Sequence, residues 1–183
     1  AGYGGTIERV GPEYGMASMF GSQYEGDTKV LIFKTASGGT SLTNQISTEG
    51  TVGQFGNWYP RSKWGAGYTP DTKTLTSDAS ACTGYLYQLF IENFQKVYTE
   101  LVANGYAPSV KGMAWMQGEQ DLGRHSEYQQ LLEVFINDLR SDLISITGDT
   151  MLQNMPFVIG EIATSFISYE NPSVTPFIEA QRA

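Results

Sequence analysis

The pattern of apolar and polar positions along the chain predicts alternating strands and helices. Strands are predicted at three short apolar runs, KVLIFK (29–34), VKGMAWM (110–116) and PFVIGEI (156–162). None of these runs alternates strictly between apolar and polar residues, which is typical of strands that are buried on both faces. We therefore expect a parallel sheet that is covered by helices.

Two longer segments have the spacing of amphipathic helices. In the later one, positions i, i+3, i+4, i+7, i+8, i+11 and i+15 form one apolar stripe. The stripe consists of Tyr128, Leu131, Leu132, Phe135, Ile136, Leu139 and Leu143. The earlier segment, residues 86–101, has a similar spacing, and Asn104-Gly105 provides a C-terminal stop. A shorter helix is expected around residues 14–20.

The alternation of strands and helices predicts an α/β fold with right-handed crossovers. In such folds, ligands bind in the loops beyond the carboxyl ends of the strands. This rule indicates three loops, TASGGTSL (35–42), QGEQDLGRH (117–125) and residues 161–168. Residues 43–81 interrupt the alternation as an insertion rich in Gly, Ser, Thr and aromatic residues. Long loops of this kind inside a domain are often functional.

Composition indicates one globular domain and excludes several kinds of partner. A chain of 183 residues can bury a substantial core, so we expect a single domain over residues 1–183. The net charge of −8 argues against nucleic acids and anionic membranes, because both require a basic face. No apolar run approaches the roughly 20 residues of a membrane span. The single cysteine, Cys82, cannot form an internal disulfide or a cysteine-based metal site.

The glycine-rich loop at residues 37–41 is a candidate oxyanion-binding segment. Gly38 and Gly39 allow the backbone to approach a ligand closely, and turned N–H groups can stabilise an anion there. A tight strand-to-helix turn would have the same sequence, and both interpretations stay open. The full phosphate-binding pattern of a P-loop is missing from this segment.

The segment QGEQD carries an amide and two carboxylates at a predicted strand end. Gln117 could donate a hydrogen bond to a developing oxyanion, and Gly118 would remove steric obstruction beside it. Glu119 could orient a neighbouring group, and Asp121 could cap a turn or the following helix. The alternative is a loop whose polar side chains are simply solvated.

Metal binding and histidine catalysis have weaker support. The set Glu119, Asp121, His125 and Glu161 matches no recognised spacing of metal ligands. As the only histidine, His125 would have to be the base of any Ser-His-Asp mechanism within this chain. Its position at the start of the later helix favours an exposed histidine instead.

Aromatic residues are concentrated in the insertion. Flat rings beside hydrogen-bonding groups suit the faces of sugars. The rings could equally pack the long loop onto the domain. The residues concerned are Trp58, Tyr59, Trp64 and Tyr68.

Five segments in this order resemble the sialate O-acetylesterase and acetylxylan esterase-like branch of the SGNH hydrolases. They are VGPEYGMASMF, IFKTASGGTSL, GMAWMQGEQD, FINDLRSDL and MPFVIGEI. The similarity covers nearly the whole chain outside the insertion, and its most specific part is residues 115–121. It implies a three-layer α/β/α sandwich with a parallel sheet. It also implies a serine esterase that removes acetyl groups from sugars, such as sialic acid or xylan, without a metal or organic cofactor.

The resemblance also assigns residues to roles. It places the oxyanion hole at Gly39 and Gln117, with Gly38 as a candidate third contributor. Glu119 and Asp121 match the two acidic positions of the motif, which have supporting rather than attacking roles. Substrate-binding residues are expected at Gly38, Thr40, Trp58 and Trp64.

Two family blocks are not visible in this sequence. One is the Gly-Gln-Ser-Asn type block with the nucleophile, and the other is the Asp-x-x-His block with the base. Ser22, Ser37 and Ser41 do not match the nucleophile block, so none is assigned this role. We favour an internal part of a longer esterase. The alternatives are a complete non-catalytic glycan-binding module, and a site that uses His125 or a different family. The family's polysaccharide substrates suggest secretion or a periplasmic location.

Overall fold

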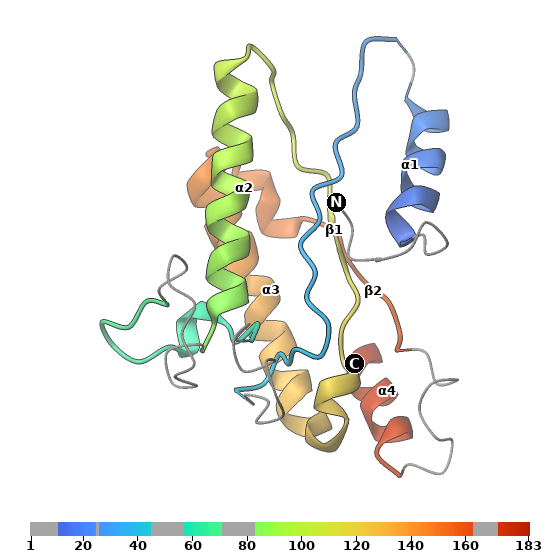
Figure 1. Cartoon of the computed structure of the whole chain (residues 1–183), viewed down its shortest axis with the longest axis vertical. Helices are drawn as coiled ribbons and strands as arrows, with labels where there is room; N and C mark the ends of the chain where they lie inside the picture. The colour runs from blue at the N-terminus through green and yellow to red at the C-terminus, as the bar shows by residue number, and fades with distance from the viewer. Residues whose placement is uncertain (1–10, 25, 45–56, 71–82, 163–171) are drawn as a thin grey trace. The chain divides into compact units, whose positions relative to one another are not determined.

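The computed structural model describes residues 11–24, 26–44, 57–70, 83–162 and 172–183 (Figure 1). The chain divides into two compact units, Ala1–Gly38 and Gly39–Ala183. Most of the insertion at 43–81 lies outside the described residues, as do Cys82 and residues 163–168 of the third predicted loop.

The first unit contains one helix and an extended segment. Helix α1, Pro12–Gln23, confirms the helix expected around residues 14–20, and its proline lies in the first turn, where no backbone donor is lost. Glu13 on this helix forms an ion pair of 2.8 Å with Lys34. The strand predicted at residues 29–34 is wrong, since residues 28–37 form no strand and run as an extended trace (Figure 1). An apolar run becomes a strand only when a neighbour pairs with its backbone.

The second unit is built around a long central helix. Helix α3, His125–Thr147, packs against α2 (Tyr85–Ala103), α4 (Val174–Arg182) and the 3₁₀ helices η4 (Glu119–Arg124) and η5 (Thr150–Asn154) (Figure 1). Both amphipathic helices predicted from the sequence are thereby confirmed. The predicted apolar stripe of α3 is buried except for Ile136, which is half-buried.

The described helix ends follow their sequence signals. Asn104 caps α2, and Gly148 ends α3 in the left-handed conformation, with φ of 74°. In the described part of the chain, every helix is too short or too polar to cross a membrane.

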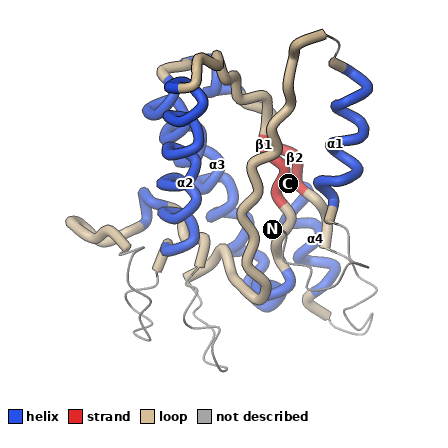
Figure 2. The backbone as a smooth tube through the Cα atoms, turned by 45° about the horizontal axis from the view of Figure 1, so that its top comes forward, coloured by secondary structure: helices blue, strands red, loops and turns tan. Residues whose placement is uncertain are grey.

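A small parallel sheet lies beside α3 (Figure 2). Strand β1, Met113–Trp115, pairs in parallel with β2, Phe157–Ile159, and Ala114 lies opposite Val158. The predicted parallel pairing is confirmed for these two strands, both of which are shorter than predicted. On one face, the rings of Trp115 and Phe135 lie 4.6 Å apart between centroids.

The prediction that the strands are buried on both faces is wrong for this sheet. Side chains alternate between the faces of a strand, so paired Ala114 and Val158 share the face opposite Trp115. Both are exposed, and Val158 has an exposed fraction of 64%. An uninterrupted apolar run therefore does not establish that both faces are covered.

Val158→Thr tests the exposure of this sheet face. We expect the free energy of unfolding in urea to change by less than about 0.5 kcal/mol, because the two side chains have the same shape and water reaches the hydroxyl. A face covered in solution would instead bury that hydroxyl and lower stability by about 1–3 kcal/mol. A loss in that range would contradict the exposed face.

Candidate functional site

Gln117 follows β1 and is held at both its main chain and its side chain. Its carbonyl oxygen accepts hydrogen bonds from the Tyr128 hydroxyl at 3.1 Å and from Gln181 Nε2 at 3.2 Å. Its own Nε2 donates to the Thr40 carbonyl at 2.8 Å and to Asp121 Oδ2 at 2.6 Å. Because the side chain is only 8% exposed, the solvated-loop alternative does not hold for Gln117.

The oxygen of the Gln117 side-chain amide has no partner in the described structure. Oε1 is buried and has no hydrogen-bond partner, whereas both N–H groups of Nε2 have acceptors within the protein. Buried polar atoms without a partner are uncommon and are often found at functional sites. The amide therefore donates two hydrogen bonds through Nε2 and accepts none through Oε1.

Asp121 joins the two candidate loops. Its carboxylate is fully buried, with an exposed fraction of 0%. Oδ2 accepts from the Leu42 N–H at 2.8 Å, and Oδ1 accepts from the Thr43 N–H at 3.2 Å and the Thr43 hydroxyl at 2.7 Å. Together with the bond from Gln117, these contacts satisfy a buried carboxylate without a basic side chain.

The predicted capping role of Asp121 is wrong. The N-cap of η4 is Gly118 and that of α3 is Arg124. The carboxylate instead reaches backbone donors nearly 80 positions earlier in the sequence, which supports an anchoring role.

The glycine-rich loop meets Gln117 through Thr40. Gly39 has φ of 68°, a left-handed conformation that glycine adopts without a side-chain clash. Thr40 and Ser41 follow it and are 5% and 1% exposed. The structure thus brings Gly39, Thr40, Gln117 and Asp121 together, whereas Gly38 belongs to the first unit.

Trp58 and Trp64 make packing contacts. Trp58 is 5% exposed, lies 5.3 Å from the Trp115 ring in an edge-to-face arrangement, and donates from Nε1 to the Thr40 hydroxyl at 3.1 Å. Trp64 is half-buried, contacts the Tyr87 ring edge-to-face, and donates to the Tyr59 carbonyl at 3.0 Å. These contacts favour the packing interpretation, most clearly for Trp58, and sugar binding by either ring stays a prediction.

The remaining polar candidates, Glu119, Glu161 and His125, each have different surroundings. Glu119 is exposed, and Glu161 forms a bidentate ion pair with Arg182 at 2.7 and 3.0 Å. His125 begins α3 as predicted but is half-buried rather than exposed, and its Nδ1 is buried without a hydrogen-bond partner. Across the described ranges, no three His, Cys, Asp or Glu side chains are grouped as metal ligands.

Two residues of this site were not identified from the sequence. Tyr128 appears in the pattern only as one apolar position of α3, and Gln181 lies in the C-terminal segment. The Tyr128 hydroxyl accepts from Trp115 Nε1 at 3.3 Å, and the Gln181 side chain links the Gln117 carbonyl to the Ile162 N–H. A tyrosine in an apolar stripe signals a buried hydroxyl that needs a partner.

Burial raises the pKa of Tyr128 from 10.0 to about 12. The folded protein therefore holds this proton more tightly than the unfolded chain does. The contribution of the protonated Tyr128 hydroxyl to the free energy of unfolding is therefore complete below about pH 10 and is lost as pH rises toward 12.

Tyr128→Phe tests this network. It removes the donor to Gln117 and leaves the Trp115 N–H without its acceptor, so we expect a loss of about 1–2 kcal/mol in unfolding free energy at pH 7. The fall in stability between about pH 10 and 12 should become shallower. Urea unfolding at several pH values measures both effects, and an unchanged pH profile would contradict the raised pKa.

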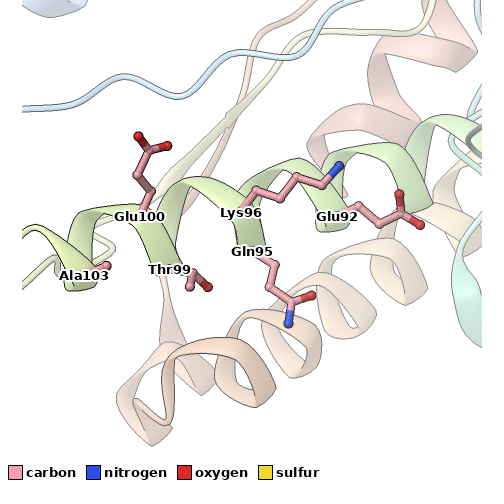
Figure 3. Close-up of a pocket in the computed structure, with 6 residues that line it drawn as sticks. All are labelled: Glu92, Gln95, Lys96, Thr99, Glu100 and Ala103. Carbon is pink, nitrogen blue, oxygen red and sulfur yellow. The ribbon is translucent and has the colours of Figure 1, made fainter.

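A shallow hollow elsewhere on the surface is lined by one helix. Figure 3 shows the side chains along α2 that line it, namely Glu92, Gln95, Lys96, Thr99, Glu100 and Ala103. None of these belongs to the Gln117 cluster, and the lining brings together no second element. The hydrogen-bonded loops around Gln117 are therefore the better candidate site.

Comparison with known families identifies the class of protein. The family model described as carbohydrate esterase, sialic acid-specific acetylesterase, matches residues 3–182. The chain belongs to this family of carbohydrate esterases. Searches of curated proteins and of solved structures found no match.

Proposed function

We propose that this protein hydrolyses O-acetyl esters on sugars by a serine-dependent mechanism, with Gly39 and Gln117 in the oxyanion hole. Membership in a carbohydrate esterase family supports the reaction class. The observation that carries the residue assignment is the 2.8 Å hydrogen bond from Gln117 Nε2 to the Thr40 carbonyl. It holds an amide donor beside the glycine-rich loop, where a second donor is expected. The three-layer α/β/α sandwich is the fold proposed to present these loops.

The chemistry requires donors for a developing negative charge. Attack on an acetyl ester turns its carbonyl oxygen into an oxyanion, and preorganised N–H groups stabilise that oxygen more than they stabilise the ester. The Gln117 N–H that faces Thr40 bonds to a neutral carbonyl. An oxyanion is a stronger acceptor than a neutral carbonyl, so it can replace Thr40 as the partner of this N–H. The nucleophile and the base are not assigned to residues of this chain.

Acetate release tests the proposed reaction. The purified protein in its natural full length is incubated with O-acetylated sialic acid and, separately, with acetylated xylo-oligosaccharides. We expect acetate release from at least one substrate and labelling by a fluorophosphonate, which reacts with activated serines. The net charge of −8 favours the neutral xylo-oligosaccharides.

Each unfavourable outcome of this assay has a defined meaning. Acetate release without fluorophosphonate labelling would retain the esterase and reject the activated serine. Binding of the acetylated sugars without acetate release or labelling would reject the esterase and support the glycan-binding alternative.

A further inference from the structure

The orientation of the Gln117 amide depends on its hydrogen-bond partners. The terminal torsion of a glutamine side chain is soft and roughly two-fold, so sterics alone do not distinguish its oxygen from its nitrogen. Here the amide nitrogen faces two acceptors, the Thr40 carbonyl and Asp121 Oδ2. A half-turn would place Oε1 against both acceptors and lose both hydrogen bonds. The two partners therefore select one orientation.

Asp121 is the stronger and the less movable of the two partners. Its bond to Gln117 is the shorter, at 2.6 Å against 2.8 Å, and a carboxylate is a better acceptor than a neutral carbonyl. Three donors from Leu42 and Thr43 hold the carboxylate in place. Its full burial leaves it no route to solvent.

We propose that Asp121 is a positioning residue for the esterase reaction, acting through the Gln117 amide. The carboxylate holds one N–H permanently, so that the other N–H stays directed at the glycine-rich loop and can exchange the Thr40 carbonyl for the substrate's oxyanion. This assignment rests on the proposed function, in which Gln117 stabilises the oxyanion. Asp121 itself touches neither substrate nor nucleophile.

Asp121→Asn tests the positioning role. Asparagine keeps the shape, but its amide nitrogen cannot accept all the bonds that the carboxylate accepts. We expect kcat for acetyl ester hydrolysis to fall by about tenfold to a hundredfold, because a small misplacement of a catalytic donor has an effect of this size. KM should stay within about twofold, because the lost interaction acts on the transition state.

Asp138→Asn is the matched control. Asp138 is a buried carboxylate on α3, 9% exposed, that accepts from the Ser62 N–H at 2.8 Å. It lies outside the Gln117 cluster, so its replacement should lower stability and leave kcat unchanged. If kcat fell in both variants, and in each case in proportion to the loss of unfolding free energy, Asp121 would have only a structural role. That result would overturn the proposal.

A spectroscopic measurement separates positioning from activity. In the wild-type protein, NMR should show that the side-chain N–H₂ protons of Gln117 exchange with water far more slowly than those of exposed Gln129. Asp121→Asn should accelerate the exchange at Gln117, whereas Asp138→Asn should not. Fast exchange in the wild type would overturn the proposal even if Asp121→Asn failed to fold.

The same measurement distinguishes failure of this inference from failure of the proposed function. If the protein hydrolyses no acetyl ester, or if Gln117→Ala leaves kcat unchanged, Gln117 has no role in ester hydrolysis, and its positioning by Asp121 has none either. Slow exchange that depends on Asp121 would then show only that Asp121 fixes the Gln117 amide structurally. If Gln117→Ala is impaired but Asp121→Asn retains full kcat, the positioning role fails alone.

Discussion

Gln117→Ala is expected to lower kcat for acetyl ester hydrolysis by about a hundredfold or more, the usual effect of removing one oxyanion donor. The truncation removes the amide that lies beside the glycine-rich loop. Because the proposed role of this donor is in the transition state, KM should change much less than kcat. Steady-state kinetics on the acetylated sugar that gives the highest wild-type rate measures both constants.

The same substitution has a separate effect on stability. It removes the Gln117 donor from the Thr40 carbonyl and one of the two donors to Asp121 Oδ2 in a buried region, at a cost of about 1–3 kcal/mol in unfolding free energy. Kinetics should therefore be measured at a temperature well below the thermal unfolding midpoint (Tm) of the variant. Gln129→Ala, at an exposed position of α3, is the control and should alter neither quantity. An unchanged kcat in Gln117→Ala would remove Gln117 from the mechanism.

The restraints on Gln117 make the arrangement preorganised. Its carbonyl is fixed by Tyr128 from α3 and by Gln181 from α4, while its amide is fixed by Asp121 and Thr40. Donors that are already oriented avoid the reorganisation that water would need when charge develops. This is the physical reason for preferring the Gln117 cluster over a solvated polar loop.

The sequence predicted the helices of this fold well and its sheet less well. The periodic stripe from Tyr128 to Leu143 is a local signal, repeated over many turns, and α3 buries it as expected. Strand formation at residues 29–34 depends on a pairing partner, which local sequence does not specify. Exposure of Val158 likewise depends on which elements cover the sheet rather than on the apolar run itself.

Some residues of the candidate site were predictable from the sequence, but its connections were not. Gln117 and Asp121 stand out because an amide and a carboxylate follow an apolar run. The partners of Asp121 at Leu42 and Thr43 lie far away in sequence, so only the folded chain reveals that the carboxylate joins two loops. Gln181 had no signal of its own, because a single glutamine in a short amphipathic segment is ordinarily a surface residue.

Gly118→Ala should destabilise the second unit by about 3 kcal/mol or more, through two independent effects. Gly118 has φ of 153°, a conformation that residues with a side chain rarely adopt. An added Cβ would also lie 2.5 Å from Cε1 of Phe177 and 3.0 Å from Cγ2 of Ile162. Phe177 is fully buried, with 0% of its surface exposed, so its ring has little room to move. Urea unfolding of the variant measures the loss.

Gly123→Ala, in the 3₁₀ helix η4 that follows Gly118, provides a control. Open space surrounds the Cβ position at Gly123, so this substitution should change the unfolding free energy by less than about 0.5 kcal/mol. A double-mutant cycle then isolates the clash. Phe177→Leu should lower the unfolding free energy of the wild type. In the Gly118→Ala background the same substitution should lower it less, or even raise it, because the smaller side chain makes room for the added methyl group. Additive effects would show that backbone strain alone requires glycine here, and a Gly118→Ala variant as stable as the wild type would contradict both the strain and the close packing beside Gln117.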